Sequence, residues 1–140
     1  MRSTRIAAIL LAVPMILGVV RPAQAASFYS LCLALDNGPS DQYLLNFNVQ
    51  GNAITVTGTL NRSVIDNYGP ISGSMSLVPG RTTWMMGLTV TYANMGDYTG
   101  PNFQHVVFEF LPTAIIYRRS LSGSSSFTQG TAHTFACPAS

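Results

Sequence analysis

The sequence predicts an all-β domain, an up-and-down antiparallel β-barrel of about eight strands, behind an N-terminal export segment. Three observations support this fold class. Apolar and polar residues alternate with a period of two, turn residues interrupt the alternation about every 8 to 12 residues, and helical periodicity is nearly absent. Eight segments with short connections, and a cysteine in the first and the last, favour a closed meander. A Greek-key β-sandwich is the alternative.

Residues 1–25 have the composition of a cleavable signal peptide. Arg2 and Arg5 precede the apolar run 6–20, and Ala23 and Ala25 supply the small side chains that the signal peptidase requires. The run has 15 residues, fewer than the roughly 20 that cross a bilayer as a helix. We therefore expect cleavage after Ala25, a single barrel domain over 26–140 without a membrane span, and a secreted or periplasmic location.

Charge excludes several classes of function. Without the signal peptide, four arginines face five carboxylates, a net charge of about −1. Such a surface offers no cationic track for nucleic acid, so we expect no DNA or RNA partner. The chain has no lysine, which excludes Schiff-base chemistry.

The two cysteines, Cys32 and Cys137, are expected to form a disulfide in an oxidising compartment. The bond would close almost the whole domain. By loop-closure entropy, a crosslink over about 100 residues stabilises a fold by roughly 4.7 kcal/mol.

The first half of the domain contains three predicted strands. Tyr29–Leu35 ends at the turn-forming residues Asp36–Pro39, Tyr43–Val49 follows, and Gln50–Asn52 forms a tight hairpin to Ile54–Leu60. The third strand places isoleucine, valine and leucine on one side and threonines on the other.

The remaining predicted strands are separated by two longer loops. A polar loop over Asn61–Gly69 precedes the strand Ile71–Leu77, and Pro79-Gly80 turns the chain into Trp84–Tyr92. After a loop over Ala93–Asn102, the last three strands are His105–Phe110, Ala114–Ser120 and Thr131–Cys137.

No motif for catalysis or metal binding stands out. Gly-x-Ser-x-Gly is absent, and His105 and Glu109 would stand about 13 Å apart on one strand face. Neither histidine has a second ligand at metal spacing. Arg118 and Arg119 would point to opposite faces, and an inward one would need an acidic partner or an anionic ligand. The simpler interpretation is a strand end with both heads in water. We therefore expect no enzyme, no catalytic residue, no metal and no cofactor.

From residue 43 to 136 the chain resembles the avidin and streptavidin family of eight-stranded biotin-binding barrels. The matching pieces are Thr57-Gly58-Thr59, Pro70-Ile71-x-Gly73, Gly87-Leu88-Thr89-Val90-Thr91-Tyr92, Arg119-Ser120 and the terminal Phe135. They occur in the family's order and at similar intervals.

The resemblance argues against biotin as the ligand. The positions of the family's ligand-stacking tryptophans correspond to Tyr92, Ile115 or Ile116, and Phe127. The residue that binds the ureido ring corresponds to His133, and the family's Tyr and Ser after Thr-Gly-Thr correspond to Leu60 and Arg62. The resemblance implies a related barrel with another ligand or with none.

Two functional hypotheses follow. In the first, the barrel binds a small, partly apolar molecule at its open end, under a lid of Asn61–Gly69, with Tyr92, Tyr117, Phe127 and His133 as contacts. His133 alternates in register with Phe135, which favours an inward position for both. In the second, the barrel is filled and acts as an interaction protein, an inhibitor or an envelope or adhesion module. A homo-oligomer assembled through the outer wall is compatible with either.

Overall fold

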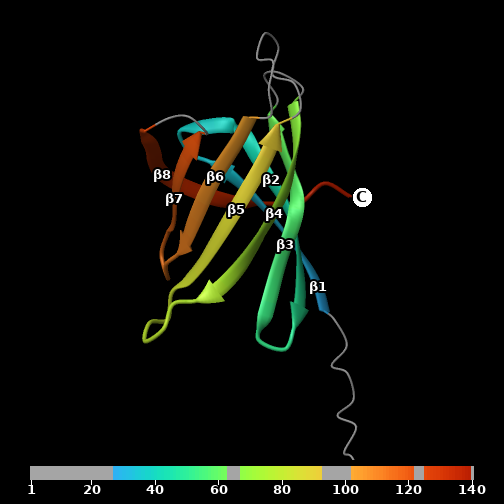
Figure 1. Ribbon diagram of the computed structural model, residues 1–140, viewed down its shortest axis with the longest axis vertical. Coiled ribbons are helices and arrows are strands. Elements are labelled where there is room, and N and C mark those ends of the chain that lie inside the picture. The colour runs from blue at the N-terminus through green and yellow to red at the C-terminus, as the bar shows by residue number, and fades with distance from the viewer. Residues whose placement is uncertain (1–26, 63–66, 93–101, 122–124, 140) are drawn as a thin grey trace, which may run out of the picture.

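The computed structural model is a closed eight-stranded antiparallel β-barrel (Figure 1). It describes residues 27–62, 67–92, 102–121 and 125–139. Each strand pairs with its neighbours in sequence, and the first pairs with the last. The up-and-down barrel is therefore confirmed, and the Greek-key sandwich is wrong. The strands are β1 (Ser27–Leu35), β2 (Gly38–Gln50), β3 (Ala53–Arg62), β4 (Asn67–Leu77), β5 (Trp84–Tyr92), β6 (Asn102–Phe110), β7 (Ile115–Leu121) and β8 (Phe127–Phe135).

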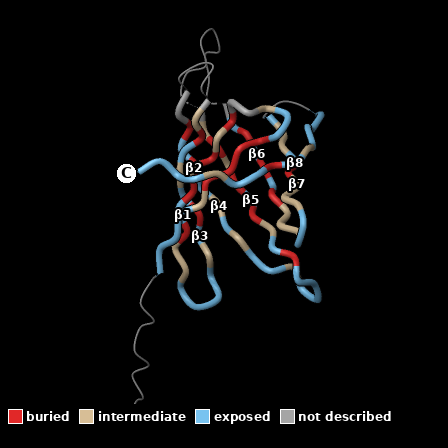
Figure 2. Tube along the Cα trace, turned by 180° about the vertical axis from the view of Figure 1, so that it is seen from behind, coloured by how far each residue is buried: buried red, intermediate tan, exposed pale blue. Residues whose placement is uncertain are grey.

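Alternating residues of the strands fill the interior. Their burial follows from the pleat of a strand, which sends successive side chains to opposite faces. Figure 2 shows the buried positions gathered along the middle of the barrel wall. The largest apolar and aromatic side chains of this core are Tyr43, Tyr117, Phe108, Leu33, Leu35, Leu45, Leu60 and Met86, all almost fully buried.

Strands β2, β3, β4 and β8 are longer than their alternation predicts. β2 begins at Gly38, so that only Asp36 and Asn37 separate it from β1. β3 reaches Arg62 and β4 begins at Asn67, so most of the predicted lid belongs to strands and 63–66 lie outside the described residues. β8 begins at Phe127. Backbone pairing extends these strands because each neighbour offers a free ladder edge, whatever the local side-chain pattern.

The seam of the barrel lies between β1 and β8. Only four residue pairs join these strands, from Cys32 opposite Phe135 to Leu35 opposite Ala132. The predicted disulfide between Cys32 and Cys137 is confirmed and lies directly beside this short ladder. It joins residues 105 positions apart and links covalently the two neighbouring strands that share the fewest paired residues in the described barrel.

The barrel has two unlike ends, seen in Figure 1. The loop end carries the β1–β2 turn and the strand ends beside residues 63–66, 93–101 and 122–124. The hairpin end carries the start of β1 and the three hairpins over 50–53, 77–84 and 110–115. The predicted signal peptide and most of the Ala93–Asn102 loop lie outside the described residues. Within the described ranges, no helix is long and apolar enough to cross a membrane.

Candidate functional site

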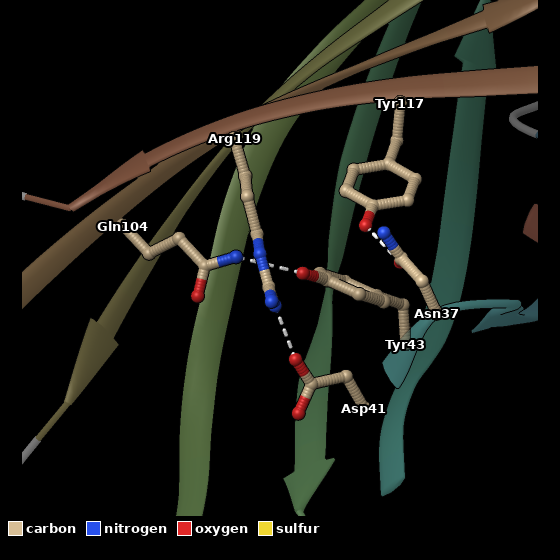
Figure 3. A network of polar contacts seen from close by, with 6 residues as sticks. All are labelled: Asn37, Asp41, Tyr43, Gln104, Tyr117 and Arg119. Atoms are coloured by element: carbon tan, nitrogen blue, oxygen red, sulfur yellow. Dashed lines mark hydrogen bonds and ion pairs between the residues drawn. The ribbon is translucent and has the colours of Figure 1, made fainter. Parts of the chain in front are cut away.

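Polar side chains occupy the interior of the barrel at the loop end. The group comprises Asp41 and Tyr43 of β2, Gln104 of β6, and Tyr117 and Arg119 of β7, and it is called the polar layer below (Figure 3). Asp41 and Gln104 are buried, and Arg119 is partly buried. Because an apolar filling would close a small barrel equally well, charged and amide groups at this depth need an explanation.

The period of two positions these groups. Asp41 lies two residues before the buried Tyr43, Gln104 lies two residues before the buried Val106, and Arg119 lies two residues after the buried Tyr117. Each polar residue therefore points into the barrel for the same reason as its apolar neighbour. The polar side chains thus come from β2, β6 and β7, of which only β6 and β7 are neighbours in the wall, and they lie at one level of the lumen.

Arg119 and Asp41 form an ion pair across the lumen, with the guanidinium Nη1 donating to Oδ2. The side chains are 21% and 6% exposed. Burial lowers the pKa of Arg119, but the hydrogen bond and the charge of Asp41 outweigh it, so the pKa is raised overall. The guanidinium carbon also lies 5.9 Å from the centre of the Tyr117 ring, at cation–π distance.

Gln104 connects the polar layer to the core below it. Its Nε2 donates to the hydroxyl oxygen of Tyr43 at 2.8 Å. The ring of Tyr43 in turn meets Phe108 edge to face, with centroids 5.2 Å apart. A buried network of this kind holds its members in one geometry because each shares polar atoms with the next.

The β1–β2 turn closes over the same end. The Tyr117 hydroxyl donates to Oδ1 of Asn37, which reaches in from the turn (Figure 3). Gly130 of β8 leaves the room for this contact, since a Cβ there would lie 2.8 Å from Nδ2 of Asn37 and 2.9 Å from Cε1 of Tyr117. The turn therefore packs against the polar layer over a strand that carries no side chain at this point.

The four ligand contacts predicted from sequence are not brought together. Tyr117 lies inside the barrel. Tyr92 ends β5, and its side chain lies outside the described residues. Phe127 and His133 are exposed on the outer wall of β8. The expected inward position of His133 is wrong, because the β8 ladder turns Gly130 and Ala132 inward.

His133 instead binds the β1–β2 turn from outside. Its Nδ1 lies 2.6 Å from Oδ1 of Asp36, and the Thr131 hydroxyl donates to Oδ2 of Asp36 at 2.5 Å. The hydrogen bond from Thr131, followed by that from His133, lowers the pKa of Asp36 below its ordinary value. Asp36 and Asn37 thus hold the turn to β8 from the outer and the inner side.

Phe127 belongs to a shallow cleft on the outer wall. The cleft has a volume of about 250 Å³ and is lined by His105 and Val107 of β6, Arg118 to Ser120 of β7, and Phe127. Nδ1 of His105 lies 3.2 Å from the Thr89 hydroxyl, and Nε of Arg118 donates to Gln129 at 3.0 Å. The cleft therefore combines an aromatic ring with one cation.

Sequence reasoning missed Asp41 and Gln104 and misjudged Arg119. The Arg118-Arg119 pair did carry a usable signal, since neighbouring strand residues face opposite ways and an inward arginine needs an acidic partner. The favoured interpretation, both heads in water, is wrong for Arg119. Asp41 gave no comparable signal, because an aspartate near a turn is common on a surface.

The polar layer can recognise a hydrogen-bonding group, but the described residues suggest no metal centre. Within the described ranges, no three histidine, cysteine or carboxylate side chains are grouped to hold a metal ion. The layer offers a guanidinium, a carboxylate, an amide and two phenol hydroxyls within one end of the lumen. Such a set can match both donors and acceptors of a planar polar group.

Comparison with known proteins adds no family to these observations. No family model, no curated protein and no solved structure matches the chain.

Proposed function

We propose that this protein is an exported binding protein, whose barrel takes up the polar head of a small, partly apolar molecule at its loop end. The observation that carries the proposal is the ion pair of Asp41 and Arg119 inside the barrel. A buried pair stabilises a fold little better than apolar residues of the same size, so its presence favours recognition over stability.

The proposed contacts differ from those predicted from sequence. Arg119, Asp41 and Gln104 would bind the polar head, and Tyr43 and Tyr117 would flank it with their rings. In the absence of ligand these groups satisfy one another, which avoids the cost of unpaired buried charges. A ligand with a carboxylate or amide would exchange these internal bonds for equivalent bonds to itself.

Native mass spectrometry of the exported protein tests the proposal. Protein purified from the periplasm or medium of its producing cells should carry a small-molecule adduct, which identifies the ligand class. The matched variant is the double substitution Asp41→Leu with Arg119→Met, which removes both charges together and should keep the fold. We expect the adduct on the wild type and not on the double variant.

The same spectra contain the outcome that overturns the proposal. A wild-type protein without any adduct, two hydrogens lighter than its reduced form, would retain the disulfide-closed barrel and exclude a resident ligand. An adduct that persists on the double variant would place the ligand elsewhere on the protein.

A second candidate is an interaction protein with a filled barrel. The observation that favours it is the outer cleft, where Phe127 is 69% exposed beside Val107 and Arg118. Exposed aromatic groups of this kind mark contact surfaces for a protein partner or for another copy of the chain. Size-exclusion chromatography of the wild type and of Phe127→Ser tests for association between copies of the chain. If the copies associate through this cleft, the wild type elutes as an oligomer and Phe127→Ser elutes as a monomer.

A further inference from the structure

The hairpin end of the barrel is open and apolar. A pocket of about 240 Å³ lies there, formed by inward side chains from β1 to β5. The lining residues are Tyr29, Phe47, Val49, Ile54, Met75 and Trp84. Only Tyr29 and Trp84 among them carry a polar atom, so the pocket suits a group without hydrogen-bonding needs.

Four large apolar side chains, called the apolar rim below, surround the mouth of this pocket and face water. Phe28 is 73% exposed, Tyr29 61%, Leu77 47% and Trp84 37%. Figure 2 shows the trace of the hairpin tips and of the start of β1 as exposed. Aromatic residues with a polar tip, such as Tyr and Trp, are favoured where an apolar phase meets water.

The tips of this end carry a single charge. In the start of β1 and the three hairpins, all of which the structure describes, Arg81 is the only charged residue. It lies exposed in the β4–β5 hairpin, a few residues from Trp84. Asp36 and Asp41 lie at the loop end instead. The hairpin tips therefore combine an apolar rim with one cation, and the nearest described carboxylate, Glu109, lies on the wall of β6 one residue before the third hairpin.

The chain outside the described residues joins the barrel at the same end. The apolar run 6–20 is connected to Ser27, where β1 begins, by the six residues 21–26. Six residues span at most roughly 20 Å when fully extended. In the uncleaved precursor, with this run held in a membrane, the hairpin end is the part of the barrel closest to the lipid.

We propose that the hairpin end is a membrane-contacting surface, which inserts its apolar rim into an anionic bilayer and receives lipid acyl chains in its apolar pocket. The lining favours hydrocarbon because it offers almost no hydrogen-bonding groups, whereas a protein interface has a polar rim. The exposed apolar side chains supply the burial, and Arg81 adds attraction to anionic headgroups.

Trp84 permits a direct test, because it is the chain's only tryptophan and lines the pocket. The probe is a vesicle of 70% phosphatidylcholine and 30% phosphatidylglycerol, mixed with the disulfide-bonded chain beginning at Ala26. We expect co-sedimentation with the vesicles, a blue shift of Trp84 emission, and quenching by lipids brominated in their acyl chains. Bromine in the chains reports on hydrocarbon contact, which binding to headgroups alone would not produce.

Substitutions localise the contact while keeping Trp84 as the reporter. Tyr29→Ser with Leu77→Ser should lower the vesicle partition coefficient at least about tenfold, given the free energy of burying each large side chain. Arg81→Gln should lower it about fivefold on anionic vesicles and leave it unchanged on pure phosphatidylcholine. The matched control is Leu121→Ser, which removes a comparably exposed large apolar side chain at the loop end and should change nothing.

Four results would overturn the proposal. These are no co-sedimentation of the wild type, no acyl-chain quenching, an equal loss in Leu121→Ser, or a wild-type dimer that Tyr29→Ser with Leu77→Ser converts to a monomer. The last result would identify a second copy as the occupant of the surface. Circular dichroism of each variant confirms that the barrel is folded, and none of these results bears on the ligand adduct tested at the loop end.

Discussion

The two ends of the lumen are built from the same strands and the same alternation, yet they have opposite chemistry. β2 contributes to both, with Asp41 in the polar layer and Phe47 and Val49 in the apolar pocket. The polar layer satisfies its charges within the barrel, through the pair of Asp41 with Arg119. The apolar pocket leaves part of its aromatic surface in water.

This contrast separates two kinds of stabilisation. Apolar groups need only be removed from water, so the contribution of each depends on its area and not on a particular partner. Charges inside a barrel need one another at a defined distance and orientation. Substitutions at the loop end should therefore be coupled in pairs, and substitutions at the hairpin end should act independently.

The largest expected effect comes from breaking the ion pair from one side. Arg119→Met leaves Asp41 charged and buried, and should lower the free energy of unfolding by about 3 to 5 kcal/mol. Adding Asp41→Leu should recover most of this loss, because the double variant buries no charge. Denaturant unfolding of the four proteins of this double-mutant cycle, with the disulfide intact, measures both values.

Phe47→Ala at the hairpin end is the matched comparison. It should cost about 3 kcal/mol through lost burial, and its effect should add to that of Arg119→Met. A double charge variant no more stable than Arg119→Met alone would contradict the pairing of these two side chains.

An intermediate effect is expected where the β1–β2 turn closes over the polar layer. Gly130→Ala places a methyl group against Asn37 and Tyr117, and should destabilise the fold by about 1 to 3 kcal/mol. Thermal unfolding measures the loss. The control is Gly87→Ala in β5, since nothing lies within 4 Å of a Cβ at that position. Equal effects of the two substitutions would indicate a general cost of alanine in these strands and not a contact with the turn.

The smallest effect concerns pH and the outer side of the same turn. The pKa of Asp36 lies below its ordinary value of 3.8, so the folded state favours its charged form. The stabilisation is fully present above that value and is lost as the pH falls through the lowered pKa. Asp36→Asn should therefore lower the melting temperature slightly at neutral pH.

The difference between wild type and Asp36→Asn should then shrink as the pH falls below 3.8. Melting curves at a series of pH values measure it. A difference that stays constant down to the lowest pH would exclude the carboxylate's charge as its origin.

The sequence predicted most of the fold because each of its signals is local. Alternation in Ile54–Leu60 and Trp84–Tyr92 identifies strands without reference to the rest of the chain. Two cysteines in a chain with a predicted export segment allow one pairing only. Strand ends were less well predicted, as at Gly38 and Phe127, because pairing with a neighbouring strand extends them.

The candidate site was mostly beyond sequence reasoning for a related reason. Alternation divides a strand into two faces but does not say which face turns inward, so His133 was expected inside and lies outside. Tyr117 lies inside the barrel, and the arginine pair indicated that one guanidinium could turn inward.

The sequence by itself therefore determined the strand content, the meander order and the disulfide, all of which follow from residue pattern and count. The tertiary structure alone decided which residues share the lumen. Asp41 and Arg119 are 78 positions apart on strands that are not neighbours in the wall, and they meet only because the barrel closes between β1 and β8. Closure sets the register of the last strand, and that register assigns each alternating residue to the interior or to water.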